Sequence, residues 1–158
     1  MVDARFEEGA DRPIALVAEA PEDLTVLSAL VQDAVFPITE MTWDRKARKL
    51  ALLVNRFRWE DRASAEAARR PYERVQSLLI VGGVLKVASQ GIDRGDPDTI
   101  LSILALDWQP GADGAGRLVV VLAGDGAISV EAECLDVSLK DVTRPYRAPS
   151  GHVPAHEG

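Results

Sequence analysis

The stretch LVVVLAGDGAISVEAEC, residues 118–134, decides the fold class. It contains two apolar runs, 118–123 and 127–134, on either side of Asp125-Gly126. That dipeptide favours a type I′ turn, which needs positive φ at both central positions. The stretch therefore predicts a β-hairpin, and with it a sheet of antiparallel strands.

A two-residue turn would set the register of this hairpin. It pairs Val121 with Val130 and turns apolar residues of both strands toward one face. Cys134 continues the apolar series of the second strand, so we predict that its thiol is buried and unreactive. The alternation changes phase after this residue, which predicts a bulge at Cys134-Leu135.

Five further strands are expected from short apolar runs that end at turn residues. They cover residues 38–43, 50–59, 72–81, 84–90 and 100–108. Gly82-Gly83 lies between two of them and predicts a second hairpin, in which Ile80 faces Leu85. The apolar phase of the strand 50–59 changes near Asn55, which a bulge there, or burial on both faces at its start, would explain. Residues 61–72 read as a loop or a short helical turn.

One helix is expected before the strands, at about residues 22–35. Pro21 suits the first helical position, and Glu22 and Asp23 are favourable at the positive end of the helix dipole. Apolar residues then recur at helical spacing as far as Val35, and Pro37 ends the pattern. Together these elements predict an α+β fold: a mostly antiparallel sheet of about seven strands, curled or a partly open barrel, with the N-terminal amphipathic helix packed on it.

The length of 158 residues suits one domain. We place it at residues 14–146, with mobile segments at 1–13 and 147–158. The N-terminus is acidic and polar, unlike a secretory signal, and no apolar stretch approaches the roughly 20 residues of a membrane span. We therefore expect a cytoplasmic protein that does not enter a membrane.

Three phrases resemble a bacterial family of unknown function, domain-of-unknown-function family 2948. They are Asn55-Arg-Phe-Arg-Trp-Glu60, Glu73-Arg-Val together with Gly82-Gly83, and Glu131-Ala-Glu-Cys-Leu-Asp136. The resemblance covers roughly residues 16–146. The family carries no assigned activity, cofactor or catalytic residue, so the resemblance implies no role for any residue here.

Several kinds of chemistry find no support in the sequence. The formal net charge of −7 argues against a general nucleic-acid binder, which needs a basic excess. The one cysteine, Cys134, excludes an internal disulfide framework and a cysteine-based zinc site. His152 and His156 are four residues apart, but Pro154 between them prevents a regular helix that would present both to a metal. We predict no catalytic residues, no metal site and no cofactor, and leave enzymatic activity open.

The charge distribution is the most informative functional feature. Residues 44–86 contain 11 basic and 5 acidic groups, a net of +6, whereas residues 1–43 and 87–158 carry −7 and −6. The basic third also carries aromatic side chains, and arginine beside aromatics is common at recognition surfaces. We predict that Arg56, Arg58 and Trp59 contribute to a binding surface, with the arginines projecting outward or into a polar cleft. On the competing interpretation they pair with acidic groups of the same molecule.

The function predicted is a non-enzymatic binding or adaptor module whose partner is an unknown protein or a small anionic ligand. A homodimer formed through a sheet edge is compatible with this function. The alternative is an enzyme, or an accessory subunit of one, that acts on a small anionic metabolite; RNA binding is a weaker alternative. A deep pocket with an arginine and two or more inward carboxylates favours the enzyme, and a flat surface with exposed aromatics favours the adaptor.

Overall fold

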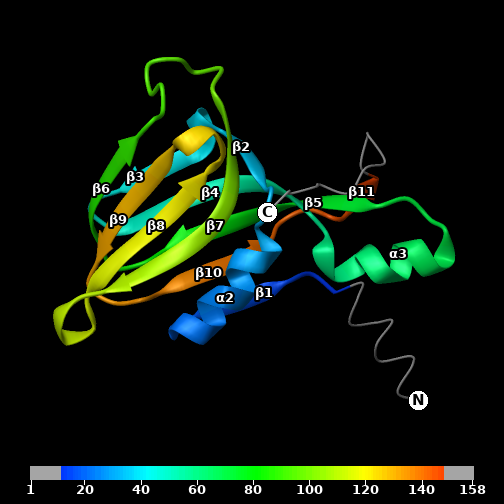
Figure 1. Ribbon diagram of the computed structural model, residues 1–158, viewed down its shortest axis with the longest axis horizontal. Helices are drawn as coiled ribbons and strands as arrows, with labels where there is room; N and C mark the ends of the chain where they lie inside the picture. The colour runs from blue at the N-terminus through cyan, green and yellow to red at the C-terminus, as the bar shows by residue number, and fades with distance from the viewer. Residues whose placement is uncertain (1–11, 148–158) are drawn as a thin grey trace.

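The computed structural model describes residues 12–147, which form an eleven-stranded sheet with two α-helices (Figure 1). The helices are α2 (Pro21–Leu30) and α3 (Arg62–Ala68). The strands are β1 (Ala15–Ala18), β2 (Val35–Pro37), β3 (Met41–Asp44), β4 (Lys49–Phe57), β5 (Glu73–Val81), β6 (Val84–Gln90), β7 (Ile100–Pro110), β8 (Gly116–Leu122), β9 (Ala127–Ala132), β10 (Val137–Asp141) and β11 (Tyr146–Arg147). None of the helices in this part of the chain is long and apolar enough to cross a bilayer.

The strands follow the order β1-β10-β5-β4-β2-β7-β8-β9-β6, with β11 beside β5 and β3 beside β4. Every neighbouring pair in residues 12–147 is antiparallel. The predicted antiparallel sheet with an N-terminal helix is therefore confirmed, but it has more strands than the seven expected and does not close into a barrel.

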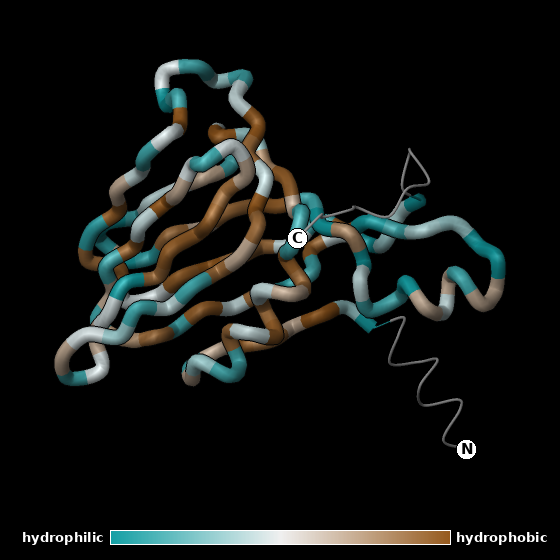
Figure 2. Tube along the Cα trace, viewed as in Figure 1, coloured by the Kyte–Doolittle hydropathy of each residue, from teal (hydrophilic) through white to brown (hydrophobic). Residues whose placement is uncertain are grey.

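The sheet is bent into two halves, one with β1, β10, β5 and β4 and the other with β7, β8, β9 and β6. The core lies between these halves. Buried residues of β4 and β5, such as Leu52 and Leu79, belong to the same apolar cluster as Val120 and Ile128 of β8 and β9. Leu27 of α2 joins that cluster, and the apolar interior of the chain is visible in Figure 2. Burial of one face of each half thus holds the layers together.

The predicted helix is correct at its start and wrong at its end. α2 begins at Pro21 but stops at Leu30, five residues short of the expected end. Asp33 adopts a left-handed conformation with φ 65°. Its N–H donates to the carbonyl of Ile103 at 2.8 Å, and the Ile103 N–H donates to the Ala34 carbonyl at 2.8 Å. These bonds draw the chain into β2, so the apolar residues at 35–37 belong to a strand.

The predicted Gly82-Gly83 hairpin is wrong. β5 pairs with β4, β10 and β11, whereas β6 pairs with β9. The two glycines carry the chain from one half of the sheet to the other, and Gly82 N–H donates to the Asp136 carbonyl at 2.9 Å. A Cβ on Gly82 would collide with the Asp136 carboxylate, so close approach explains this glycine, and Gly83 has the positive φ of 65°.

The hairpin of residues 118–134 exists, but its register differs from the prediction. Val130 pairs with Leu118 rather than with Val121. The turn occupies residues 123–126 and includes Asp125 at φ 65°, so it is longer than the two-residue turn assumed. The shift by three residues turns the even-numbered residues of β8 into the core.

Neither predicted bulge is present. β4 and β5 pair without interruption from Leu50 to Phe57, so there is no bulge at Asn55. The buried phase of β4 continues to Arg56, and Phe57 is buried on the opposite face. Both faces are therefore covered at the end of β4, not at its start.

Cys134 is exposed, which contradicts the prediction of a buried thiol. β9 ends at Ala132, and residues 133–136 cross to β10 in the other half of the sheet. The alternation of β9 therefore does not extend to Cys134. Leu135 takes the buried position instead, so a crossover between sheet halves replaces the expected bulge.

The segment between β4 and β5 projects from the sheet (Figure 1). We call residues 58–72 the arm; it contains a 3₁₀ turn, Trp59–Asp61, and α3. The expected short helical turn at 61–72 is thus two turns of α-helix. The limits of the domain at 14–146 stay a prediction, and the segments expected to be mobile lie outside the described residues except at positions 12, 13 and 147.

Candidate functional site

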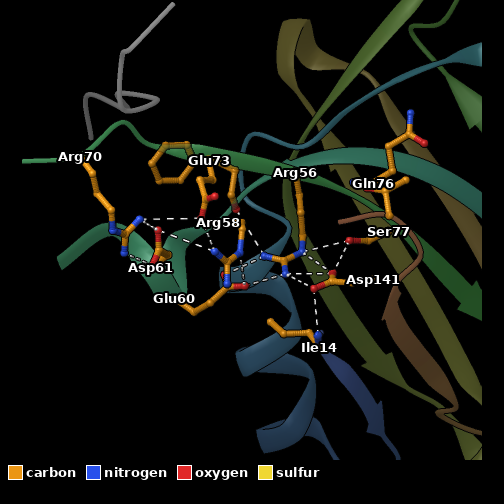
Figure 3. Close-up of polar contacts among 12 residues, drawn as sticks. Ile14, Arg56, Arg58, Glu60, Asp61, Arg70, Glu73, Gln76, Ser77 and Asp141 are labelled. Atoms are coloured by element: carbon orange, nitrogen blue, oxygen red, sulfur yellow. Dashed lines mark hydrogen bonds and ion pairs between the residues drawn. The ribbon is translucent and has the colours of Figure 1, made fainter. Parts of the chain in front are cut away.

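A chain of alternating charges runs along the base of the arm (Figure 3). It consists of Asp141, Arg56, Glu60, Arg58, Glu73, Asp61 and Arg70, which we call the arginine–carboxylate cluster. The members come from β4, the arm, β5 and β10. The cluster thus joins the arm to three neighbouring strands of the sheet.

Arg56 is the centre of the cluster and is fully buried. Arg56 follows Leu52 and Val54 on the buried face of β4. Its guanidinium therefore lies at the border between the apolar core and the polar groups of the cluster. Two of its nitrogens bind Glu60 at 2.8 Å each, and Nη2 lies 3.0 Å from both carboxylate oxygens of Asp141. Its Nε also donates to Ser77 Oγ at 3.1 Å. Paired bonds of this kind are the strongest that arginine makes with carboxylates.

Asp141 makes other hydrogen bonds besides those to Arg56. Its Oδ1 accepts from Ser77 Oγ at 2.7 Å, and its Oδ2 accepts from the backbone N–H of Ile14 at 2.9 Å. The Asp141 N–H in turn donates to the Ile14 carbonyl at 2.9 Å. The carboxylate therefore fastens the start of β1 as well as β4 and β5.

Arg58 and Arg70 bind the remaining carboxylates. Arg58 Nη1 lies 2.5 Å from Glu73 Oε1 and 3.7 Å from Asp61 Oδ2. Arg70 binds both oxygens of Asp61, at 2.6 and 2.7 Å. Arg58 and Asp61 are buried, while Arg70 lies at the surface. Through Asp61, Arg58 at the beginning of the arm is thus linked to Arg70 near its end.

The electrostatics of the cluster favour the charged forms of Arg56 and Asp61. Burial opposes the charge of Arg56, but hydrogen bonds and charges from Glu60 and Asp141 outweigh it and raise the pKa of the guanidinium. Burial likewise opposes the charge of Asp61, yet the Arg70 hydrogen bond and the charges of Arg58 and Arg70 lower the pKa of that carboxyl. A carboxylate held ionised in this way is a poor proton donor at neutral pH.

The aromatic residues lie on the other face of β4. Phe57 is buried, and its ring centroid lies 4.7 Å from Trp59 and 5.6 Å from Tyr72. Trp59 Nε1 donates to the Gln32 carbonyl, just after α2, at 3.0 Å. The rings are inclined to one another by 61° and 54°, so they do not make a flat exposed aromatic surface, and Tyr72 Oη donates to Glu66 of α3 at 2.9 Å.

An open cleft of about 460 Å³ lies beside the cluster, and we call it the arm-base cleft. It is lined by Arg12, Pro13, Arg58, Glu73, Asp141, Thr143, Arg144 and Pro145. Arg12 and Arg144 are exposed, whereas Arg58 and Asp141 are buried side chains on the cluster side. The Thr143 hydroxyl accepts from the Gln76 N–H at 3.1 Å, which ties one wall of the cleft to β5.

The three residues predicted to bind a partner occupy different places. Arg58 lines the arm-base cleft, Arg56 lies behind it within the cluster, and Trp59 belongs to the aromatic core of the arm. The arginines do not project to the surface: their exposed side-chain fractions are 0% and 2%. The internal pairing that was the competing interpretation is what the contacts show, and a binding role for these residues stays a prediction.

Sequence reasoning missed the acidic half of the cluster. No sequence motif identifies Glu60, Asp61 or Asp141 as the acidic partners of these arginines. A signal for Asp141 was present, because it continues the inward phase of Val137 and Leu139. A charged residue in phase with a buried strand face indicates a buried partner of opposite charge.

A metal site has no support in the part of the chain described. Across residues 12–147, no group of three or more His, Cys, Asp or Glu residues is placed to hold a metal ion. His152 and His156 lie outside the described residues. The side chains with hydrogen-bonding groups that line the arm-base cleft are those of Arg12, Arg58, Glu73, Asp141, Thr143 and Arg144.

Comparison with known proteins assigns a family and no activity. The model of a family described as "protein of unknown function (DUF2948)" matches residues 14–156. No curated protein and no solved structure matches the chain. The match is to the family that the three sequence phrases resemble.

Proposed function

The chain belongs to the family described as protein of unknown function, DUF2948, and we propose that it is a non-enzymatic binding module that holds a small anionic ligand in the arm-base cleft. The observation that carries this proposal is the charge balance at the cleft. Three arginines, Arg12, Arg58 and Arg144, line it together with two carboxylates, in a chain whose net charge is −7. The volume of about 460 Å³ suits a small molecule.

The carboxylates of the cleft are already bound to arginines. Asp141 is bound by Arg56, and Glu73 is bound by Arg58. Each carboxylate that lines the arm-base cleft thus has a positive partner within the arginine–carboxylate cluster. The exposed guanidinium group of Arg144 presents donors that suit the oxygens of a carboxylate or a phosphate.

The cluster supports the proposal in a second way, because it restrains the cleft before any ligand arrives. Groups fixed by several hydrogen bonds lose little freedom on binding, which favours affinity. Asp141 is held by Arg56, Ser77 and the Ile14 N–H. We therefore assign the buried arginines to holding the site and the exposed Arg144 to contacting the ligand.

The test uses inorganic phosphate and succinate as probes against the full chain, with chloride at matched ionic strength as the reference. Bound anions should raise the melting temperature, because ligands that bind the folded state stabilise it, and should shift the amide resonances of Thr143 and Arg144. Arg144→Ala should abolish both effects. Arg94→Ala removes an exposed arginine of the β6–β7 connection and should preserve them. No response to either anion, or an equal response in Arg144→Ala, would reject the proposal.

An enzyme acting on a small anionic metabolite is the second candidate, and one observation favours it. The cleft places an arginine, Arg58, beside two carboxylates, Glu73 and Asp141. Glu73 is the better candidate for proton transfer, since its side chain is 30% exposed whereas that of Asp141 is 3% exposed. Turnover of small anionic metabolites by the wild-type chain and its loss in Glu73→Gln, with anion binding retained, would favour the enzyme over the binding module.

A protein-binding adaptor is the other form of the binding module that the sequence predicts, and affinity capture distinguishes it. The full chain would be used as bait in a native cytoplasmic extract, with bound proteins and bound small molecules both identified. Recovery of an anionic small molecule that Arg144→Ala does not retain supports the cleft proposal. If a protein is recovered and phosphate does not affect its binding, that protein is recognised by a surface other than the arm-base cleft.

A further inference from the structure

The two ends of the sheet differ in how they are protected against pairing with another strand. At one end, β6 carries Lys86, and its register shifts between Val84 and Lys86. A lysine and a bulge both discourage a further strand from adding to an edge. At the other end, β1 has the sequence ALVA, with no charge, no proline and no bulge.

The hydrogen-bonding groups of β1 alternate between its two sides. Ile14 and Asp141 exchange hydrogen bonds on the side of β10, and the register continues from Ala15 opposite Lys140 to Ala18 opposite Val137. In an antiparallel ladder, alternate residues direct their N–H and C=O groups away from the partner. Ala15 and Val17 therefore direct these groups to the outer side of β1, where no strand of residues 12–147 pairs with them.

The side chains of β1 add an apolar surface to this edge. Val17 is 57% exposed and Leu16 is 39% exposed. In Figure 1, β1 lies at the border of the fold, with α2 in front of it. An exposed apolar edge with outward backbone groups is suited to accept another strand.

We propose that β1 pairs antiparallel with β1 of a second copy of this chain, which joins the two sheets across a twofold axis. An antiparallel pair of identical strands is self-complementary, as a twofold interface requires. The charges at the ends of β1 favour this orientation. Arg12 and Lys140 lie near its N-terminal end, and Glu19 and Glu22 follow its C-terminal end.

Antiparallel pairing places the basic end of each β1 beside the acidic end of the other. A parallel pair would instead bring like charges together, which is unfavourable for strands that lie side by side. Complementary charge at the rim also steers association and selects the orientation. The second copy is thus a better match for this edge than an arbitrary extended peptide.

The experiment is sedimentation equilibrium of the full chain over a wide range of concentration. The wild-type chain should approach twice the mass of one chain, and Val17→Lys, which places a charge at the pairing edge, should sediment as one chain. Ile100→Lys is the matched control, because Ile100 is an apolar strand residue that is 62% exposed and lies outside β1. It should associate as the wild type does.

A wild-type chain that remains at the mass of one chain throughout overturns the proposal, and so does Val17→Lys with unchanged association. Hydrogen exchange of the unmodified chain provides a test that does not depend on folding of the variant. Protection of the Val17 amide should increase with protein concentration, whereas that of the Lys86 amide on β6 should not. A protection of Val17 that is independent of concentration would reject the pairing.

Discussion

Both carboxylate oxygens of Asp141 on β10 lie 3.0 Å from the guanidinium Nη2 of Arg56 on β4, although β5 lies between these two strands. Both side chains are buried, and β5 contributes Ser77 between them. The pair therefore spans β4, β5 and β10 on the core side of the sheet. Because the same carboxylate accepts from Ile14, the position of β1 also depends on it.

Asp141→Ala should destabilise the fold strongly. The substitution leaves the buried Arg56 without one of its two carboxylates and the Ile14 N–H without its acceptor. Removing one partner of a buried pair typically costs about 3–5 kcal/mol in the free energy of unfolding, and we expect a loss in that range from denaturant titration. Glu133→Ala is the control, because the Arg48–Glu133 pair is exposed on both sides and such pairs contribute about 0–1 kcal/mol. Equal losses in the two variants would contradict the assigned role of Asp141.

Arg56→Ala/Arg58→Ala should also unfold at much lower denaturant concentration. If the two arginines served only to bind a partner, this double variant would change stability by less than about 1 kcal/mol, as expected of exposed charges. The structure instead buries both arginines against Asp141, Glu60 and Glu73. Their loss leaves several carboxylates unpaired, so we expect a loss of about 3 kcal/mol or more.

The matched comparison for that variant is Arg94→Ala/Arg117→Ala, which removes two exposed arginines. It should retain nearly the full free energy of unfolding. If the two double variants behave alike, the arginine–carboxylate cluster contributes little to stability, and the surface role predicted from the sequence regains its support.

The stability supplied by Asp61 should depend on pH. Its folded-state pKa lies below the ordinary value of 3.8 because Arg70 and Arg58 favour the ionised form against burial. A lowered pKa means that the unfolded chain binds more protons, so this contribution is present above about pH 4 and is lost as the pH falls through the folded-state pKa. The difference in free energy of unfolding between wild type and Asp61→Asn should therefore shrink on acidification from about pH 7 to about pH 2.5. A difference that stays constant over this range would show that the Asp61 charge contributes nothing.

The elements that sequence reasoning found were those specified by neighbouring residues. Pro21 with the acidic residues after it marks the start of α2, and the apolar runs mark most strands. The failures concern contacts between distant segments. Gly82-Gly83 has the composition of a tight turn, yet β5 finds its partners in β4 and β10, and β6 finds its partner in β9. Which strands pair depends on how two apolar faces cover each other, and a local pattern does not contain that information.

The candidate site shows the same limit. The aromatic neighbours of Arg56 mark it as an important residue, but the same neighbours, assigned to the buried face of the strand, direct its side chain outward or into a polar cleft. The inward phase of β4 was unbroken at Arg56, and the inward phase of β10 was unbroken at Asp141. Each residue alone is unfavourable in a core, and only the tertiary pairing of the two makes either position acceptable.

Cys134 should react rapidly with a thiol reagent in the native state. Its side chain is exposed in the crossover between β9 and β10, and access is one requirement for reaction of a free thiol. Labelling with a maleimide should reach one equivalent per chain without denaturant and at the same extent after unfolding. Cys134→Ser should take up no label. Labelling that appears only in denaturant would show that the thiol is buried, as the sequence alone predicts.

Two tryptophans provide a matched pair for testing how the arm is attached. Trp59 Nε1 donates to the Gln32 carbonyl at 3.0 Å, so it links the arm to the segment after α2. Trp43 Nε1 is also buried, but among residues 12–147 it has no hydrogen-bond acceptor. The guanidinium carbon of Arg45 lies 4.4 Å from the centroid of its ring, so this side chain interacts through its face.

Trp59→Phe should therefore cost more than Trp43→Phe, although both remove one indole N–H. The first removes a partly buried hydrogen bond to the Gln32 carbonyl, and an intramolecular hydrogen bond typically contributes about 0.5–1.5 kcal/mol. The second removes a buried donor that has no acceptor, and this gain offsets the weaker packing of the smaller phenylalanine ring. Denaturant unfolding of the two variants gives the comparison, and hydrogen exchange in α3 reports whether the arm loosens. The order of the two losses is the decisive result: if Trp43→Phe is the more damaging, the bond from Trp59 to Gln32 does not hold the arm to the body.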